Sequence, residues 1–541
     1  MTSSQRARVC NTPVSLSLIA LLVAACGSST DESGPDVPNF SLTPGSAGSG
    51  AAPGVVPPSG DPSNPDPGTA PAGSETPGVG SEAPDDGIAL EPTQPAPTGT
   101  GEVPATDPSQ TPVTPAEPDP TAPTEEPVPE APTASPDRPT RGTPNLFTDL
   151  LGIPVGEVDA KVRLAVDRIF GIGTNESAIP QVNTGFRVYY ELPQDPSQAF
   201  IWCADANDVR SEGQSYGMMI AVQMNMQTEF DKLWRFAQQR MQFATTDAWN
   251  RYFRWQGQVT VNGNSINVNF GQNGPAPDGD EYFAAALYLA DRRWGSGGAI
   301  NYEQEADAIA TALLNNAGNA QGRVPIIDAQ SNMVVFFPQG NSAGFSDPSY
   351  HLPAFYELFA QDGNPGDANR WRQIANVSRQ YFVQSANGNT GLHPDYANFN
   401  GTPNTGGNGQ THDQFRYDAW RVPMNMAVDY AWTGPDARLQ TQVEKYHAFF
   451  GSRLGANNIP NALFLLNGTV ANDDSGPSTA LAATLAAGAL ASTAQNRADF
   501  VENLWNTPQQ SGTYRYYQET VYALGLLATA GWFGYEFTPA Q

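Results

Sequence analysis

The side chains best suited to chemistry in this sequence are carboxylates that stand where apolar helix patterns begin. Glu212 lies among small and polar residues ahead of Met218 and Met219, and in that setting it could keep a raised pKa and donate a proton. Asp418 precedes Arg421 by three residues, so the two would meet on a helical turn that holds Asp418 ionised. A neutral acid and an ionised base are the pair that glycoside hydrolysis requires.

Each of these acids also has a purely structural interpretation. The helix dipole favours an acidic residue in the first turn, which would account for Glu212 alone. An ion pair that only stabilises the fold would account for Asp418 and Arg421 alone. Their occurrence together with further acids and many aromatic residues favours the chemical interpretation.

Two more stretches add acids and aromatic rings to this set. Asp278 opens a run of acids at 278–281 ahead of small residues, and it could serve either as a helix N-cap or as a catalytic group. Asp347 and the proline after it predict a turn that opens a helix, with Tyr350 in its first turn or buried as a structural aromatic. Exposed aromatic faces are platforms for sugar rings, and the candidates are Trp255, Tyr350 and Trp420.

Several other classes of function are disfavoured by the residue types present. The four histidines form no ligand pair at helical spacing, so no metal site is predicted. We find no convincing glycine-rich phosphate loop and no Gly-x-Ser-x-Gly motif, so no cofactor is predicted. A formal net charge of −28 argues against nucleic acid as a partner.

The first 26 residues resemble a bacterial lipoprotein signal. Arg6 and Arg8 supply the positive charge, and the apolar run at 14–25 is too short to span a bilayer. The residues that end in Cys26 resemble a lipobox, so we expect cleavage before Cys26 and lipidation of its thiol. The protein is then expected outside the cytoplasm, anchored at the cell envelope, with Ser28 favouring the outer membrane. The alternative is an ordinary secretory signal.

Residues 27–140 predict a disordered tether. They are rich in Pro, Gly, Ser, Thr and acids, with no Lys or Arg between Arg8 and Arg138. Such a segment has too little apolar surface to offset its ordering entropy. Much of the negative charge lies here, and we expect the tether to hold a folded domain at 141–541 away from the membrane, which the protein would touch through its lipid only.

The folded domain is predicted to be mostly helical. With Cys10 and Cys26 placed in the signal, Cys203 remains alone in this domain and is expected to be buried and inert. Strand signals are short, at 186–192, at 259–270 as a hairpin on Asn262-Gly263, and at 334–337. The predicted helices are 156–170, 213–242, 279–294, 302–317, 350–361, 367–386, 422–433, 436–452, 478–492, 496–506 and 517–530. They predict paired helices around a central axis, with function on loops at one end.

Together these motifs resemble glycoside hydrolase family 8. Residues 211–218 resemble the general-acid stretch of that family, 276–294 its signature, and 417–421 the stretch that bears the general base. The resemblance covers about 145–532 and implies an all-α (α/α)6 barrel and an inverting mechanism. It implies Glu212 as proton donor, Asp418 as the base that activates water, and Asp278 as a ligand of the distorted sugar. Water and base would be positioned by Tyr350, Tyr417 and Arg421.

Within the family, the sequences at 208–212, 347–358 and 395–399 resemble those of reducing-end xylose-releasing exo-oligoxylanases. Those enzymes close the cleft with a His-containing loop, whereas the corresponding residues 472–477 contain no His. An endo-β-1,4-xylanase therefore remains the alternative, with cellulase or chitosanase activity less favoured. From other classes, we weigh a carbohydrate-binding lipoprotein, disfavoured by its retained acids, and a sugar epimerase, disfavoured by its few histidines.

Overall fold

The computed structural model describes residues 135–538 except 183, 272, 317–321, 408–409 and 456–457. The predicted signal, Cys26 and the predicted tether up to residue 134 lie outside the described residues. Described contacts begin at Ser135, whose backbone N–H donates to Asp159, a few residues before the predicted start of the domain at 141. Over the described ranges, no helix combines the length and the apolar character that a membrane span needs.

Six helices form a closed inner ring, in which each packs on the next inner helix along the chain and the last packs on the first. They are apolar nearly all round, and every residue of the last two is buried. In chain order they are α3 (Ser211–Gln223), α5 (Pro277–Trp294), α7 (Pro353–Asp362), α9 (Val422–Thr433), α11 (Thr479–Gly488) and α13 (Arg515–Thr529).

Six further helices cover this ring. Five of them follow an inner helix in the chain and pack back on it, while α2 comes first and packs on α13. Their buried positions recur at steps of three and four, as an amphipathic helix requires. They are α2 (Val155–Phe170), α4 (Gln227–Phe236), α6 (Tyr302–Asn315), α8 (Ala368–Ser385), α10 (Ala437–Gly451) and α12 (Arg497–Asn506), with the short α1 (Leu146–Leu151) beside α12. The arrangement is the predicted (α/α)6 barrel.

The two ends of the described chain meet where inner helices end. Strand β1 (Arg141–Gly142) pairs with β9 (Gly534–Glu536), which follows α13. Gln223, the last residue of α3, donates to the Gly534 carbonyl. Arg293, near the end of α5, donates to the Asp137 carbonyl. These bonds join the first and last parts of the described chain and close the barrel.

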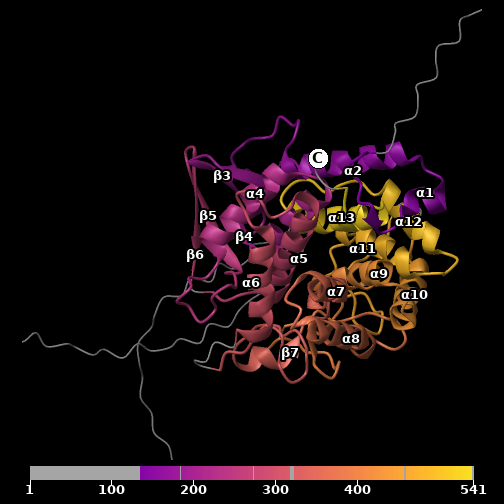
Figure 1. Ribbon diagram of the computed structural model, residues 1–541. Helices are drawn as coiled ribbons and strands as arrows, with labels where there is room; N and C mark the ends of the chain where they lie inside the picture. Colours follow the sequence, from indigo (N-terminus) through magenta and orange to yellow (C-terminus); the bar gives the residue numbers. More distant parts are fainter. Residues whose placement is uncertain are drawn as a thin grey trace, which may run out of the picture. The chain divides into compact units, whose positions relative to one another are not determined.

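A five-stranded antiparallel sheet lies beside α4, in strand order β2-β3-β4-β5-β6 (Figure 1). The hairpin predicted at Asn262-Gly263 is confirmed, with Gly263 in the left-handed region at a φ of 61°. Strand β4 runs directly into α3, so the sheet fixes where α3 begins. The strands are β2 (Tyr189–Leu192), β3 (Asp195–Cys203), β4 (Asp208–Arg210), β5 (Gln256–Asn262) and β6 (Ser265–Phe270).

Two predicted elements differ from the structure. The single helix predicted at 213–242 is wrong, because Asn225 takes a left-handed φ of 59° and separates α3 from α4. The apolar spacing runs across this break because both helices bury one face. The strand predicted at 334–337 is only an isolated bridge between Val334 and Ile327. Strand β3 was not predicted, and Cys203 at its end is buried as expected.

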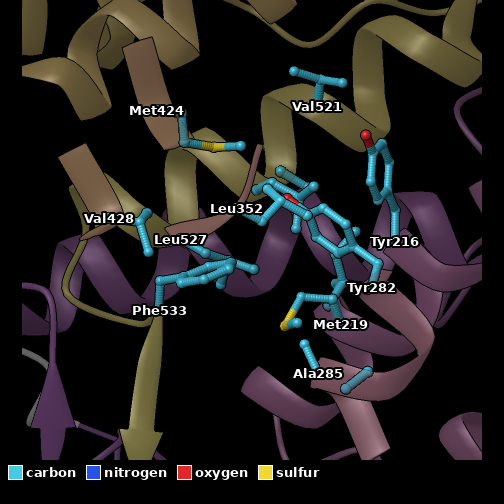
Figure 2. Packing of buried hydrophobic residues seen from close by; sticks show 14 of the residues in the cluster. Tyr216, Met219, Tyr282, Ala285, Leu352, Met424, Val428, Val521, Leu527 and Phe533 are labelled. Carbon is cyan, nitrogen blue, oxygen red and sulfur yellow. The ribbon is translucent and has the colours of Figure 1, made fainter. Parts of the chain in front are cut away.

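The centre of the barrel is packed with apolar side chains. Figure 2 shows labelled side chains that meet there, among them Met219 of α3, Tyr282 of α5, Met424 of α9 and Leu527 of α13. Small residues let α11 and α13 approach closely, since a Cβ on Gly525 would lie 2.7 Å from the carbonyl carbon of Ala483. The interior is therefore filled, and chemistry is left to the ends of the helices.

Candidate active site

Side chains from the starts of inner helices converge at one end of the barrel. Glu212 and Asp278 are each the second residue of their helix, in α3 and α5. A short 3₁₀ turn, Asp418–Arg421, leads into α9, and another, Pro348–Tyr350, precedes α7. Tyr516 lies in the first turn of α13. The predicted loop function is thus placed mainly on helix starts and on the turns before them.

Arg421 stands at the centre of this group and binds carboxylates from three segments. Its Nη1 lies 3.1 Å from Glu212 Oε2 and 2.8 Å from Asp278 Oδ2. Its Nη2 lies 2.9 Å from Asp418 Oδ1. The guanidinium is buried, with 3% of the side chain exposed, so these are charge-assisted contacts with little solvent screening. Glu212 and Asp418 therefore lie on different nitrogens of one guanidinium.

Glu212 is held from its other side by Tyr516. The Tyr516 hydroxyl donates to Glu212 Oε1 at 3.0 Å. This approach depends on Gly213, because a Cβ there would lie 2.3 Å from the Tyr516 ring. The Glu212 side chain keeps 15% of its surface exposed, more than Asp278 or Asp418.

Burial and the Arg421 charge act in opposite directions on the pKa of Glu212. Burial raises its pKa to about 7, Arg421 opposes that rise, and the negative charges of Asp278 and Asp418 add to it. Glu212 is thus partly protonated near neutral pH. Asp418 also lies beside the Arg421 guanidinium, with its Oδ1 2.9 Å from Nη2. A carboxyl group that is partly protonated near neutral pH, as Glu212 is, can act as a general acid.

Two further buried acids adjoin this group. Burial raises the pKa of Asp278, and Arg421 opposes the rise. Asp347 lies 3.9 Å from Arg421 Nη2, and burial raises its pKa strongly. Asp347 also caps the 3₁₀ turn, with Oδ1 accepting from the Ser349 N–H at 2.6 Å. Ser349 Oγ in turn accepts from Arg421 at 2.7 Å, so this turn helps to fix the guanidinium.

The aromatic residues predicted to bind sugar differ in position. Tyr350 lies at the acidic group, with the Arg421 guanidinium 5.8 Å from its ring centroid. Trp255 borders Arg210, whose guanidinium lies 5.9 Å from the indole. The exposed faces predicted for Trp255, Tyr350 and Trp420 are wrong, because all three side chains are buried. The Trp420 indole donates to the Ala462 carbonyl at 2.9 Å.

Tyr417 is half-buried and packs against Trp420. Its ring meets the Trp420 indole edge-on, with the ring centroids 5.2 Å apart. Its carbonyl accepts from the Tyr517 hydroxyl at 2.6 Å. The buried Trp420 indole therefore supports the Tyr417 ring. Of the two residues, Tyr417 is the one that keeps contact with solvent.

Sequence reasoning assigned no site role to several residues that complete the geometry. The hydroxyl of Tyr216 accepts from Arg421 Nη1 at 2.6 Å. Tyr216 lies within the stretch 211–218 that the sequence singled out, but no role was assigned to it. Tyr516 lies about 300 residues from Glu212 in the sequence, and Tyr517 lies about 100 residues from Tyr417. The signal that could have found them was their position, at and just before the start of the last predicted helix.

The loop at 472–477 is fastened beside the site. Asp473 accepts two hydrogen bonds from Arg416, at 2.9 Å and 2.7 Å. Asp474 accepts from the backbone N–H groups of Ala462 and Leu463. Arg416 lies two residues before Asp418, so this loop is tied to the segment that carries the predicted base. Within the described part of the chain, no group of three His, Cys, Asp or Glu side chains is arranged to hold a metal ion.

Comparison with known proteins identifies relatives of this arrangement. Residues 201–531 match the family model described as glycosyl hydrolases family 8. The reducing-end xylose-releasing exo-oligoxylanase Rex8A of Paenibacillus barcinonensis is 38% identical over 349 residues, which cover 64% of this chain and 87% of that protein. Endoglucanase A of Acetivibrio thermocellus is 34% identical over 49% of this chain and 50% of its own length.

A solved structure gives the same result for the fold. The catalytic mutant of a family 8 xylanase from Teredinibacter turnerae, in complex with xylohexaose, aligns with a TM-score of 0.64 at 34% sequence identity. The alignment covers 73% of this chain and 98% of that one.

Replacement of Arg421 by Gln is expected to destabilise the fold by about 3 kcal/mol or more at pH 8, because it leaves several buried carboxyl groups without their cation. The loss should be smaller at pH 5, since Glu212, with a pKa of about 7, is protonated there, and the raised pKa of Asp278 acts in the same direction. Urea unfolding at both pH values measures this.

The matched control is Arg141→Gln, whose ion pair with Glu536 is exposed and should contribute less than about 1 kcal/mol. An Arg421→Gln variant as stable as this control at pH 8 would contradict the central role of the guanidinium.

Proposed function

The chain belongs to glycosyl hydrolases family 8 and is a glycosidase, and from that premise we propose that it cleaves β-1,4-xylosidic bonds with inversion and releases xylose from the reducing end of xylo-oligosaccharides. The observation that carries this proposal is the set of curated relatives that share most of their length with the chain and are named as reducing-end xylose-releasing exo-oligoxylanases.

The proposed mechanism uses Glu212 as the acid. Its pKa of about 7 keeps a proton available near neutrality, and it is the most exposed of the carboxyl groups that bind Arg421. The proton passes from Glu212 to the glycosidic oxygen as the bond between that oxygen and the anomeric carbon breaks. Tyr516 holds the carboxyl group in place through its hydroxyl.

Asp418 is the proposed base. It takes a proton from a water molecule whose oxygen forms the new bond to the anomeric carbon from the opposite face, which inverts the configuration. Inversion requires about 6.5–9.5 Å between the two carboxyl groups, to leave room for that water. The placement of Glu212 and Asp418 on different nitrogens of the Arg421 guanidinium supports a gap of this kind. Asp278 is proposed to bind the distorted sugar.

An endo-β-1,4-xylanase is the second candidate. It is favoured by the loop at 472–477, which contains no His and is held down by Arg416 and by backbone N–H groups. A loop fastened in this way is less suited to closing the far end of a cleft. The alignment with a xylanase whose complex contains xylohexaose also supports this alternative.

The substrate is tested with xylo-oligosaccharides labelled at the reducing end, with products followed over time. We expect labelled xylose as the only early labelled product. A spread of longer labelled products would instead favour the endo-xylanase. If xylo-oligosaccharides remain intact while cello- or chito-oligosaccharides are cleaved, the xylan proposal is wrong within the family.

The roles of the two acids are tested by substitution. Glu212→Gln and Asp418→Asn should each lower kcat by about 10³-fold or more, because each removes a proton-transfer group that the bond cleavage requires. Circular dichroism and urea unfolding should show a folded protein in both variants. Anomer analysis by NMR should find the α-configured product first from the parent enzyme. Near-normal turnover in either variant would remove that residue from the mechanism.

The pH dependence follows from the raised pKa of Glu212. A proton donor must be protonated, so kcat/KM of the free enzyme should fall about tenfold per pH unit above about 7. An unperturbed Glu would place that fall near pH 4.3. Initial rates between pH 4 and 9 at low substrate concentration measure it. A decline that is complete by pH 5 would mean that Glu212 is not the acid.

A further inference from the structure

A second acid lies directly behind the predicted base and does not touch Arg421. Asp395 is fully buried, and its Oδ1 accepts from the backbone N–H of Ala419 at 3.2 Å. Ala419 is the residue after Asp418, so this bond fixes the peptide that carries the Asp418 side chain. The bond joins the segment before the 3₁₀ turn to the turn itself.

The other oxygen of Asp395 is bound by His412. Its Nδ1 lies 3.2 Å from Asp395 Oδ2. The His412 ring stacks on Tyr396, with ring centroids 4.0 Å apart and an interplanar angle of 18°. Two backbone bonds hold the strand-like pairing of these segments, from the Asp395 N–H to Gln414 and from the Tyr396 N–H to His412.

His412 differs from the other three histidines of the chain. His351, His393 and His447 are fully buried, and their ring nitrogens bond to hydroxyl or carbonyl oxygens. His412 instead contacts a carboxylate and keeps 16% of its side chain exposed. His412 is therefore in contact with solvent and forms a pair with a buried carboxyl group beneath the catalytic turn. The acid–base step described above uses neither member of this pair.

We propose that Asp395 and His412 act as a positioning pair for the base, in which ionised Asp395 holds the Ala419 N–H and His412 holds Asp395. The proposal rests on the assignment of Asp418 as base. Asp395 cannot touch substrate, because it is fully buried, so its effect must pass through the backbone of the turn. A charged acceptor makes a hydrogen bond about twice as strong as a neutral one, and a catalytic group displaced by 1 Å can cost about 10²-fold in rate.

The charges around Asp395 support a dependence on His412. Burial raises the pKa of Asp395 to about 6, the hydrogen bond and charge of His412 lower it, and Asp418 raises it. Other titratable or charged groups that interact with Asp395 are Asp347, Tyr396, Arg416, Tyr417 and Tyr517. Loss of His412 therefore leaves Asp395 protonated up to a higher pH.

The first test compares two substitutions of Asp395 in the full chain. Asp395→Ala removes both the charge and the acceptor, and kcat should fall about 10²-fold with KM changed less than about threefold. Asp395→Asn keeps an acceptor oxygen for Ala419, and kcat should fall only about tenfold. The matched control is Asp436→Asn at the N-cap of α10. Asp436 likewise accepts from a backbone N–H and from a basic side chain, both of Arg438, and its substitution should leave kcat unchanged.

The second test separates a positioning role from a structural one. His412→Asn should move the acidic limb of the kcat profile to higher pH in the parent enzyme and leave it unmoved in the Asp395→Asn background. An equal shift in both backgrounds, or an Asp395→Ala variant within threefold of the parent kcat, overturns the proposal. The proposal is also overturned if kcat, KM and unfolding stability all change together in Asp395→Ala.

A readout without substrate distinguishes this proposal from the proposed function. Hydrogen exchange of the peptide that contains Ala419 should be about tenfold faster in Asp395→Ala than in the parent and nearly unchanged in Asp395→Asn. If the parent enzyme cleaves no xylo-oligosaccharide but cleaves another β-1,4-glycan, the kinetic tests use that glycan and only the xylan proposal fails. Unchanged exchange in Asp395→Ala overturns the positioning pair whatever the substrate.

Discussion

Burial of several carboxyl groups around one guanidinium is the constraint on which the rest of this structure depends. Arg421 binds Glu212, Asp278 and Asp418 directly and lies 3.9 Å from Asp347. A single positive charge cannot compensate that many negative charges in a buried site, so some of these acids must carry protons near neutrality. The mixture of protonated and ionised carboxyl groups is therefore a consequence of enclosure. It arises only if the segments that supply the acids are forced together, which is what the closed ring of inner helices does.

The ring also explains why the acids are found where they are. Inner helices α3, α5, α9 and α13 bring their first turns, or the turns just before them, to the same place, while their apolar bodies fill the barrel. A polar side chain in the middle of such a helix would have to be satisfied inside the core. At a helix start it can bind a neighbouring helix start instead. Arg421 joins α9 to α3 and α5, and Tyr516 joins α13 to α3.

Much of the site could be read from the sequence because its main residues lie in short, unusual stretches. Glu212, Asp278, Asp418 and Arg421 were all singled out, and the structure brings the four together. What could not be read were contacts between distant segments, such as Tyr516 on Glu212, because spacing along the chain carries no information about which helices become neighbours. The same holds for the fold. Apolar periodicity predicted the helices, whereas the break at Asn225 was missed because the apolar pattern continues through it.

Burial was the property least accessible from residue types. Trp420 was expected to present a face to solvent, yet its indole lies behind Tyr417. Strand β3 was not predicted, since it contains Pro196 and polar residues in its first half, although its second half is fully buried. In both cases the surroundings that decide exposure come from parts of the chain far away in sequence.

The closure between β1 and β9 fixes which end of the barrel the first described residues occupy. The described chain starts at Ser135, and Asp137 accepts from Arg293 near the end of α5 and from Asn225 just after α3, at the opposite end from the acidic group. The first described residues therefore pack at the end of the barrel away from the acidic group. Substrate that enters at the acidic end does not have to pass this segment, and product can leave by the same opening.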